Sequence, residues 1–413
     1  MIGAYFRRGY RKWFLGSGTD EEKTMDLSIS DGVFWTIYSN MTSPYIVAFS
    51  ILVIGPTAPV GYIIGIPYLV VPLAQYFAVK LSRRTVDLRS LTIKITIFDR
   101  VVWILIALLV FLRGYLLLSF LMIVLLSVRV FFSSFSGTTW NAWVPSAIGS
   151  KKRNLYFSRR NLFLRLFSLV GYGIASMIFF LLGSTKIAYV VLFVGSLIFS
   201  TLSLFIMQRI PPFKPEKEDT GGVSAAGKVL LSYLLFTLLT GIGLSAFSPY
   251  MQLYILSSSF LGQSAQIYTL VIIVIAVAAI SSQLFWGKFI ERVGNRKTIL
   301  LSGSIISIVP LWVAYTSSIV ILFFPIILLG LAQSGFTLAA FNELIRRTER
   351  RRVSGISIYN ITQSLSVAVG PVFANVIFDL YRTSLLPIFV LSFSLTLIGS
   401  VYYYLHSTFA VGK

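Results

Sequence analysis

The chain lacks cysteine altogether and has a single histidine, His406. Without cysteine it can form neither disulfides nor thiolate metal sites, and one histidine excludes most metal chemistry. Paired carboxylates and Ser-His-Asp arrangements in a credible context are also missing. A run at 222–228, GVSAAGK, has the spacing of a phosphate-binding loop, but valine follows it where Ser or Thr must bind Mg²⁺. We therefore expect no metal, no cofactor and no enzymatic activity.

Charged residues are also scarce. They make up 12% of the chain, against about a quarter of a soluble domain, while hydrophobic residues make up 56%. Apolar runs of about 18 residues or more recur, each long enough to cross a hydrocarbon core of about 30 Å as a helix. The sequence thus predicts an all-α polytopic membrane protein. Its twelve expected spans cover 33–53, 57–79, 95–112, 115–143, 156–182, 187–208, 229–256, 265–287, 298–316, 319–343, 355–380 and 384–405.

The basic residues outnumber the acidic ones, 35 to 14, and they fall on one side of the expected membrane. If residue 1 is cytoplasmic, Arg113, Lys186 and Arg382 alone lie on the far side, and Arg129 lies inside a span. Because Lys and Arg in cytoplasmic loops set orientation, this bias predicts a protein of the cytoplasmic membrane with both termini in the cytoplasm. Anionic lipid headgroups, and not nucleic acid, are the expected partners of the surplus charge.

Polar stretches divide the chain. The first 30 residues have no apolar core of the kind a signal peptide needs, so we expect a retained cytoplasmic tail. A second polar stretch, rich in Pro, Gly and charge, has six expected spans on each side and is typical of a flexible linker. The expected divisions are a tail at 1–30, a six-helix bundle at 31–208, a linker at 209–228, a second bundle at 229–406 and a tail at 407–413.

The two halves repeat each other at an offset of about 200 residues. SPY occurs at 43–45 in the first span and again at 248–250 in the seventh. The stretch QYFAVKLSRR at 75–84 aligns with GKFIERVGNR at 287–296, in corresponding loops. Arg153 and Arg352 each precede a Ser and an Asn at the same spacing. Because these matches occur in the same order, we infer an internal duplication.

The loop after the eighth span carries the pattern G-x3-D/E-R-x-G-x-R/K, which resembles the signature of the major facilitator superfamily of secondary transporters. The resemblance implies two pseudo-symmetric six-helix bundles that rock around a central site. It also implies a gating role for the motif and for the basic residues at related positions in both halves. These residues are Gly287, Glu291, Arg292, Gly294, Arg296, Lys297, Lys80, Arg84, Arg153 and Arg352.

Glu291 is the acid of this motif, and by pseudo-symmetry we expect it to face the N-terminal end of the fifth helix. Unsatisfied N–H groups and the positive end of the helix dipole stabilise an anion there by roughly 0.3–1 kcal/mol. Such a contact would act as a latch on the cytoplasmic side. In the N-terminal copy Val79 replaces the acid, so one latch is expected and not two. The alternative is a solvated loop whose charges only set topology.

The resemblance implies that helices one, four, seven and ten line a midplane cavity. Four residues of the fourth span, Arg129, Ser133, Ser136 and Trp140, share one helical face. Arg129 is functional by default, because a cation inside a span is costly unless it faces a cavity or a partner; the alternative is an arginine satisfied by helix carbonyls. The other candidates, for which plain packing is an equal alternative, are Tyr38, Thr42, Tyr45, Phe49, Tyr250, Gln252, Tyr254, Gln333 and Thr337.

Proton coupling needs a carboxylate or histidine within the spans. The acids within or beside spans are Asp31, Asp99, Glu343 and Asp379, and all four are expected near span ends. Glu343 and Asp99 are the candidates, and uncoupled diffusion stays open.

The expected function is transport of a small organic solute by a monomer. Many aromatics and few charges favour proton-coupled efflux of drug-like or amphipathic metabolites, whereas Arg129 favours an anion. Uptake of a sugar, organic acid or similar nutrient by symport or uniport is the first alternative. A non-transporting sensor on the same fold is the second, and a membrane-embedded enzyme the third.

Overall fold

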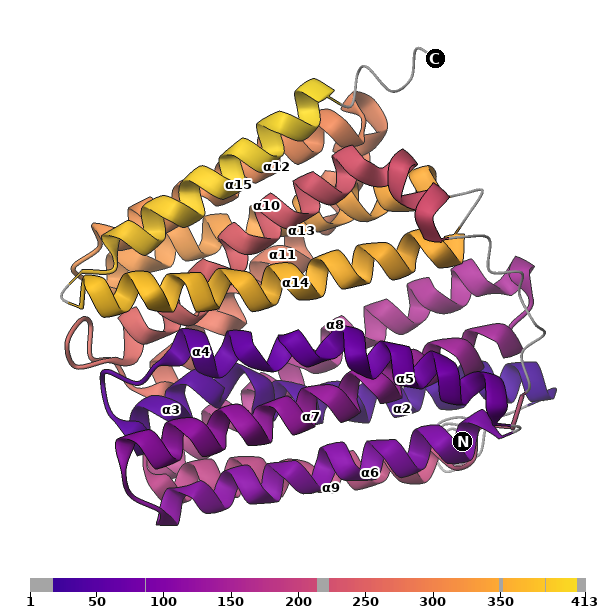
Figure 1. The fold of residues 1–413 in the computed structure, drawn as a ribbon, viewed down its shortest axis with the longest axis horizontal. Coiled ribbons are helices and arrows are strands. Elements are labelled where there is room, and N and C mark those ends of the chain that lie inside the picture. Colours follow the sequence, from indigo (N-terminus) through magenta and orange to yellow (C-terminus); the bar gives the residue numbers. More distant parts are fainter. Residues whose placement is uncertain (1–17, 86, 214–222, 349–351, 383, 407–413) are drawn as a thin grey trace, which may run out of the picture. The chain divides into compact units, whose positions relative to one another are not determined.

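The computed structural model describes residues 18–85, 87–213, 223–348, 352–382 and 384–406, and within these ranges the chain forms helices and turns without any strand (Figure 1). The all-α prediction is therefore confirmed. Contacts divide the chain into two compact units. The first unit runs through Phe49 and from Val70 to Lys217, and the second comprises Ser50–Leu69 together with the chain from Glu218 onward.

The helices of the first unit begin with a capped turn. Thr19 and Glu22 form a capping box, in which each side chain accepts a hydrogen bond from the other residue's backbone N–H. The helix that follows, α2, begins at Asp20, inside the stretch predicted as a polar tail. The helices are α2 (Asp20–Thr42), α5 (Val71–Arg84), α6 (Leu88–Leu108), α7 (Tyr115–Trp143), α8 (Ser150–Leu182) and α9 (Lys186–Met207), and α3 (Ile46–Ile54) crosses from this unit into the second.

The second unit repeats the helix pairing of the first. In the first unit α2 packs on α8 and α9, α6 packs on α7 and α9, and α5 packs on α7. In the second unit α10 packs on α14 and α15, α12 packs on α13 and α15, and α11 packs on α13. These helices are α10 (Val223–Leu256), α11 (Ala265–Val293), α12 (Asn295–Ala314), α13 (Ile319–Thr348), α14 (Arg352–Leu380) and α15 (Leu386–His406). The duplication inferred from the motifs is thus also present in the packing.

One pair of glycines shows how close the repeat is. A Cβ added to Gly171 on α8 would lie 2.9 Å from the carbonyl oxygen of Ile37 on α2. A Cβ added to Gly370 on α14 would lie 2.5 Å from the carbonyl oxygen of Ile242 on α10. Both distances are too short for a real side chain, so glycine lets the backbones of corresponding helices approach. Small residues commonly play this part in membrane helix pairs.

The second expected span is interrupted. It consists of α4 (Val60–Gly65), a 3₁₀ stretch at Ile66–Val70 and then α5. Pro67 and Pro72 lack backbone N–H groups, which accounts for a break in the α-helical ladder here. The α4 segment belongs to the second unit, where it packs on α14 and α10 (Figure 1).

Eleven helices of the described chain are long and apolar enough to cross a membrane. The one expected span not among these eleven, the third at 95–112, falls on α6, which carries Arg89, Lys94, Asp99 and Arg100. This helix starts at Leu88 and not near 95, so Asp99 lies near its middle and the expectation of a span-end position is wrong. Asp31 likewise lies well inside α2, whereas Glu343 and Asp379 do lie near the ends of their helices.

Candidate functional site

A buried ionic cluster lies in the first unit, in the middle of α6. Asp99 Oδ2 accepts a hydrogen bond of 2.9 Å from Arg100 Nη1, and Asp99 Oδ1 lies 3.6 Å from Arg129 Nε on α7. The side chains of Asp99, Arg100 and Arg129 are 5%, 7% and 13% exposed. The cluster therefore holds two guanidinium groups and one carboxylate almost out of contact with solvent.

Aromatic rings and a hydroxyl complete this cluster. The guanidinium of Arg100 lies over the ring of Tyr38 on α2, 4.0 Å from its centroid. That of Arg129 lies over Trp103, one turn along α6, at 4.9 Å. Arg129 Nη2 also donates to Ser43 Oγ at 3.3 Å. Ring faces attract cations, so the two arginines are fixed by contacts from three separate helical segments.

Polar pairs continue from this cluster along the seam between α6 and α7. The hydroxyls of Thr96 and Ser136 are 2.6 Å apart, and Thr92 donates to Thr139 at 2.8 Å. The seam thus presents an ion pair and two hydroxyl pairs where an apolar interface would suffice for packing. Of the predicted face of the fourth span, Arg129 and Ser136 join the seam, while Ser133 is half-buried.

A second polar group lies nearby in the same unit. Asp31 is buried and accepts a 2.6 Å hydrogen bond from Ser203 on α9. Arg160 of α8 lies over the ring of Trp140, 4.5 Å from its centroid, and is a charged neighbour of Asp31. The guanidinium of Arg100 is also a charged neighbour of Asp31 and so faces two carboxylates.

The other predicted residues of the first span make packing contacts or hydrogen bonds within their own helix. Tyr45 and Phe49 are fully buried in an aromatic core, with ring centroids 5.3 Å from Phe179 and 5.2 Å from Phe193. Thr42 donates to the carbonyl of Tyr38 in its own helix at 3.0 Å. Tyr38 is the first-span candidate whose ring lies against the ionic cluster.

The predicted residues of the seventh and tenth spans are not gathered into one cluster within the second unit. Tyr250 donates to Asn375 Oδ1 at 3.0 Å, and Tyr254 donates to the carbonyl of Thr316. Gln252 is buried, whereas Gln333 and Thr337 are exposed on α13.

Asn375 is the centre of a buried polar contact between α4, α10 and α14. Its Oδ1 accepts hydrogen bonds of 3.0 Å from the backbone N–H of Gly61 and from the hydroxyl of Tyr250. Its Nδ2 donates to Asp379 at 3.1 Å. The amide thus satisfies a donor at the start of α4, where no preceding helical carbonyl is available.

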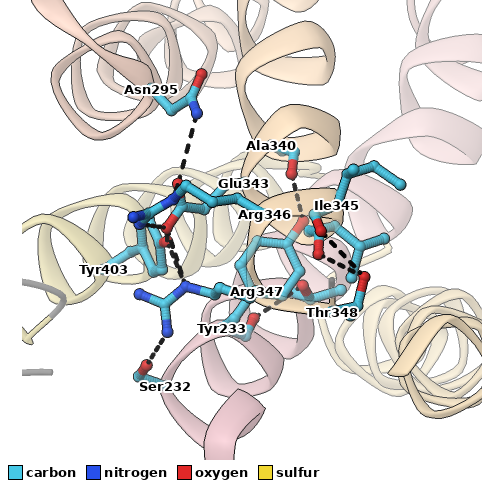
Figure 2. A network of polar contacts seen from close by, with 12 residues as sticks. Ser232, Tyr233, Asn295, Ala340, Glu343, Ile345, Arg346, Arg347, Thr348 and Tyr403 are labelled. Atoms are coloured by element: carbon cyan, nitrogen blue, oxygen red, sulfur yellow. Dashed lines mark hydrogen bonds and ion pairs between the residues drawn. The ribbon is translucent and has the colours of Figure 1, made fainter. Parts of the chain in front are cut away.

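The second coupling candidate, Glu343, is surrounded by donors (Figure 2). Its Oε1 accepts from Tyr403 at 2.6 Å and from Arg347 Nε at 2.9 Å, and Arg346 contacts both carboxylate oxygens. Asn295, from a neighbouring helix, points toward the carboxylate (Figure 2). Its Nδ2 lies 3.5 Å from Oε2 of Glu343. Both oxygens are therefore occupied by side chains of the same unit.

The signature loop forms the turn between α11 and α12. Gly294 has φ +84°, which favours glycine, and it separates Val293 from Asn295. Gly287 instead lies inside α11, away from this turn. Four further motif residues flank this turn: Glu291 and Arg292 lie in the last turn of α11 and are exposed, and in the first turn of α12 Arg296 is half-buried and Lys297 exposed.

The corresponding residues of the N-terminal half are held locally. Lys80 Nζ lies 5.7 Å from the ring centroid of Tyr76, and Arg84 ends α5. Arg153 Nη2 donates to the carbonyl of Ile148 at 3.1 Å. Arg352 begins α14, but its side chain lies outside the described part of the chain.

Arg100, Trp103 and Asp31 were missed as site residues. The signal for Arg100 and Trp103 was present in IFDRVVWI, residues 97–104, where opposite charges stand side by side in an apolar run. With the span placed at 95–112, this pair fell at its edge. Within the described residues, no group of three or more His, Cys, Asp or Glu side chains could hold a metal ion.

The comparisons with known proteins agree with this architecture. Residues 231–411 match the sequence model of the Major Facilitator Superfamily. No curated protein sequence matches the chain. Among solved structures, the nucleoside transporter NupG is similar at a TM-score of 0.69 and 10% identity, covering 96% of this chain and 100% of its own.

Two further solved transporters show the same fold. A bacterial homologue of the human lysosomal transporter Spinster is similar at a TM-score of 0.68 and 11% identity, covering 96% of this chain and 98% of its own. A bacterial homologue of the iron transporter ferroportin is similar at a TM-score of 0.65 and 16% identity, covering 92% of this chain and 97% of its own. The predicted resemblance to the major facilitator superfamily is confirmed in sequence for residues 231–411, and the fold is that of these solved transporters.

Proposed function

We propose that this protein is a secondary transporter that moves a small organic solute across the cytoplasmic membrane, coupled to protons through Asp99. The observation that carries the proposal is the position of Asp99, buried near the middle of α6 between the guanidiniums of Arg100 and Arg129. A carboxylate within a membrane helix is costly and marks a functional position by default. Glu343 supports the proposal less, because its oxygens are occupied by neighbouring side chains.

The coupling follows from the charge balance of the cluster. When Asp99 is ionised, it offsets one of the two guanidinium charges; when it is protonated, it offsets neither. Breaking a buried ion pair typically costs about 3–5 kcal/mol, so the two protonation states differ strongly in what they bind. A difference of this kind is what links a proton site to a solute site.

Two directions of transport are compatible with this site. Efflux of amphipathic solutes by proton antiport is supported by the aromatic rings of Tyr38 and Trp103 beside the charges. Uptake of an organic acid by proton symport is supported by the excess of guanidinium groups over carboxylates in the same cluster. In antiport, proton and solute compete for the site, whereas in symport they bind together.

Purified protein in proteoliposomes that enclose a pH-sensitive dye distinguishes these cases. Addition of a transported solute without an imposed gradient should change the internal pH. Acidification on solute entry indicates symport, and alkalinisation indicates antiport. Protein-free liposomes given the same solutes control for passive entry of weak acids and bases. Solute entry without any protein-dependent pH change would contradict proton coupling, and no entry of any solute would contradict transport.

A further inference from the structure

We infer that Arg100, Arg129 and Trp103 form a binding site for an anionic group, a carboxylate or a phosphate, on the transported solute. This inference deepens the proposed function and rests on it. It concerns which chemical class the site takes, which neither the family nor the fold specifies.

The first argument is charge. Arg100 faces Asp31 and Tyr38 from α2 and Asp99 from its own helix, α6; Arg129 of α7 is a further charged neighbour of Tyr38, and Arg160 of α8 is one of Asp31. Three guanidiniums therefore face two carboxylates within the described part of the unit. One positive charge is left without a counter-ion in a low-dielectric interior, where an isolated charge is unfavourable.

The second argument is an excess of donors. Arg100 Nε, Arg129 Nε and Trp103 Nε1 are buried, and none has a hydrogen-bond acceptor within the described residues. Trp103 is fully buried. Buried polar groups are normally hydrogen-bonded, so three N–H groups without acceptors in one place indicate an acceptor-rich occupant. Asp99 Oδ1 is a buried acceptor that also lacks a hydrogen bond and lies 3.6 Å from Arg129 Nε; a small shift pairs it with that N–H alone, which leaves Arg100 Nε and Trp103 Nε1 without acceptors.

The third argument is geometry. A guanidinium presents its N–H groups in a planar fork that matches a carboxylate or a phosphate. Arg100 uses Nη1 to hold Asp99, while Arg129 makes a single long hydrogen bond, 3.3 Å, to Ser43. Arg129 is also the most exposed member of the cluster. We therefore assign contact with the anion chiefly to Arg129, and the placement of Asp99 to Arg100.

The arrangement couples the anion to the proton with a defined sign. An ionised Asp99 competes with the solute anion for the guanidiniums. A proton taken up by Asp99 removes that competition, so the anion and the proton are bound together and carried in the same direction. Anion binding should consequently strengthen as the pH falls, which favours the symport direction.

The test is thermal unfolding of the purified full-length protein with charged probes and their uncharged counterparts. Acetate, benzoate, citrate and phenyl phosphate are compared with benzamide and benzyl alcohol, at constant sodium chloride and at two pH values. Because ligand binding raises stability in proportion to the logarithm of ligand concentration over Kd, at least one anion should raise Tm, more at the lower pH. Equal stabilisation by the uncharged probes, or none by any anion, would overturn the assignment.

Variants tie the effect to the site. Arg129→Gln should weaken binding of the active anion at least about tenfold, the factor that 1.4 kcal/mol represents. Arg113→Gln, which removes an exposed loop arginine, should leave it unchanged. If Arg129→Gln does not fold, Trp103→Phe removes one unpaired N–H and should weaken the anion severalfold. Unaltered anion affinity in the folded variant would refute the site.

Flux measurements with the same probes separate this inference from the proposed function. If an anion binds but does not enter the proteoliposomes, the anion site is supported and the proposed transport is refuted. If benzamide or benzyl alcohol enters and no anion does, the proposed transport is supported and the anion site is refuted.

Discussion

Glu343 on α13 and Tyr403 on α15 are joined by a 2.6 Å hydrogen bond between a buried carboxylate and a buried phenol. Arg347 donates to both of them, at 2.9 and 3.1 Å, and reaches Ser232 on α10 at 3.3 Å. With Asn295 of α12 also directed at it, the carboxylate is the centre of a network that ties four helices of the second unit together. This position makes Glu343 a structural anchor first.

Glu343→Gln should therefore destabilise the protein. The substitution keeps the size of the side chain but leaves the largely buried Arg347 without its counter-ion. We expect a loss of about 3 kcal/mol, the low end of the range for a broken buried ion pair, because Arg346 is half exposed. Thermal unfolding in detergent measures it. Glu291→Gln, at an exposed acid, should change stability by less than about 0.5 kcal/mol; equal losses for the two variants would argue against an anchor.

Asp99→Asn should uncouple transport from protons. Asparagine fills the same space but takes up no proton, so a pH gradient should no longer drive solute accumulation. Exchange of labelled for unlabelled solute across the membrane requires no net proton movement and should persist. Both quantities are measured with the same proteoliposomes. If the pH gradient still drives accumulation in this variant at the wild-type rate, Asp99 is not the coupling residue. Asp31 would then be the next candidate.

Gly171→Ala and Gly370→Ala should destabilise the two units by similar amounts. Each new methyl group would meet a backbone carbonyl of the facing helix, and overpacking of this kind costs about 1–3 kcal/mol. Gly173→Ala is the matched control, because the space around a Cβ at that position is open. Chemical unfolding of the three variants tests this. If Gly173→Ala loses as much stability as the other two variants, helix flexibility and not the close approach of the backbones is responsible.

Most of the fold could be predicted from residue classes alone. Long apolar runs identify membrane helices because water cannot satisfy the backbone there. The repeated motifs indicated two related halves, and the pairing of helices confirms this. The interruption in the second span was missed, although Pro67 and Pro72 were its signal, because hydropathy does not register lost hydrogen bonds.

The site could be predicted only in part. Helical periodicity singled out Arg129, and scarcity of acids singled out Asp99. Their contact could not be predicted, because it depends on which faces of α6 and α7 meet. Arg100 was missed for a different reason: hydropathy placed the start of its helix about two turns late, so the Asp99–Arg100 pair fell at the edge of the expected span.

The latch expected at Glu291 remains a prediction about the conformational equilibrium. Glu291 is exposed on the last turn of α11, next to Arg292 and just before the turn at Gly294. If its carboxylate binds the N-terminal end of the fifth helix in the outward-open state, Glu291→Gln removes about 0.3–1 kcal/mol from that state. The inward-open population should then rise about two- to fivefold.

The absence of cysteine makes this measurement direct, since a single introduced thiol is the only one to react. Thr337→Cys places it on the exposed face of α13, and a membrane-impermeant maleimide applied to inside-out vesicles reads its accessibility from the cytoplasmic side. Labelling should accelerate about two- to fivefold when Glu291→Gln is added. Glu291→Asp keeps the charge and should label at nearly the parent rate, and Lys288→Gln controls for a change in loop charge alone. If Glu291→Gln and Lys288→Gln accelerate labelling equally, the loop charge sets only topology and the latch does not exist.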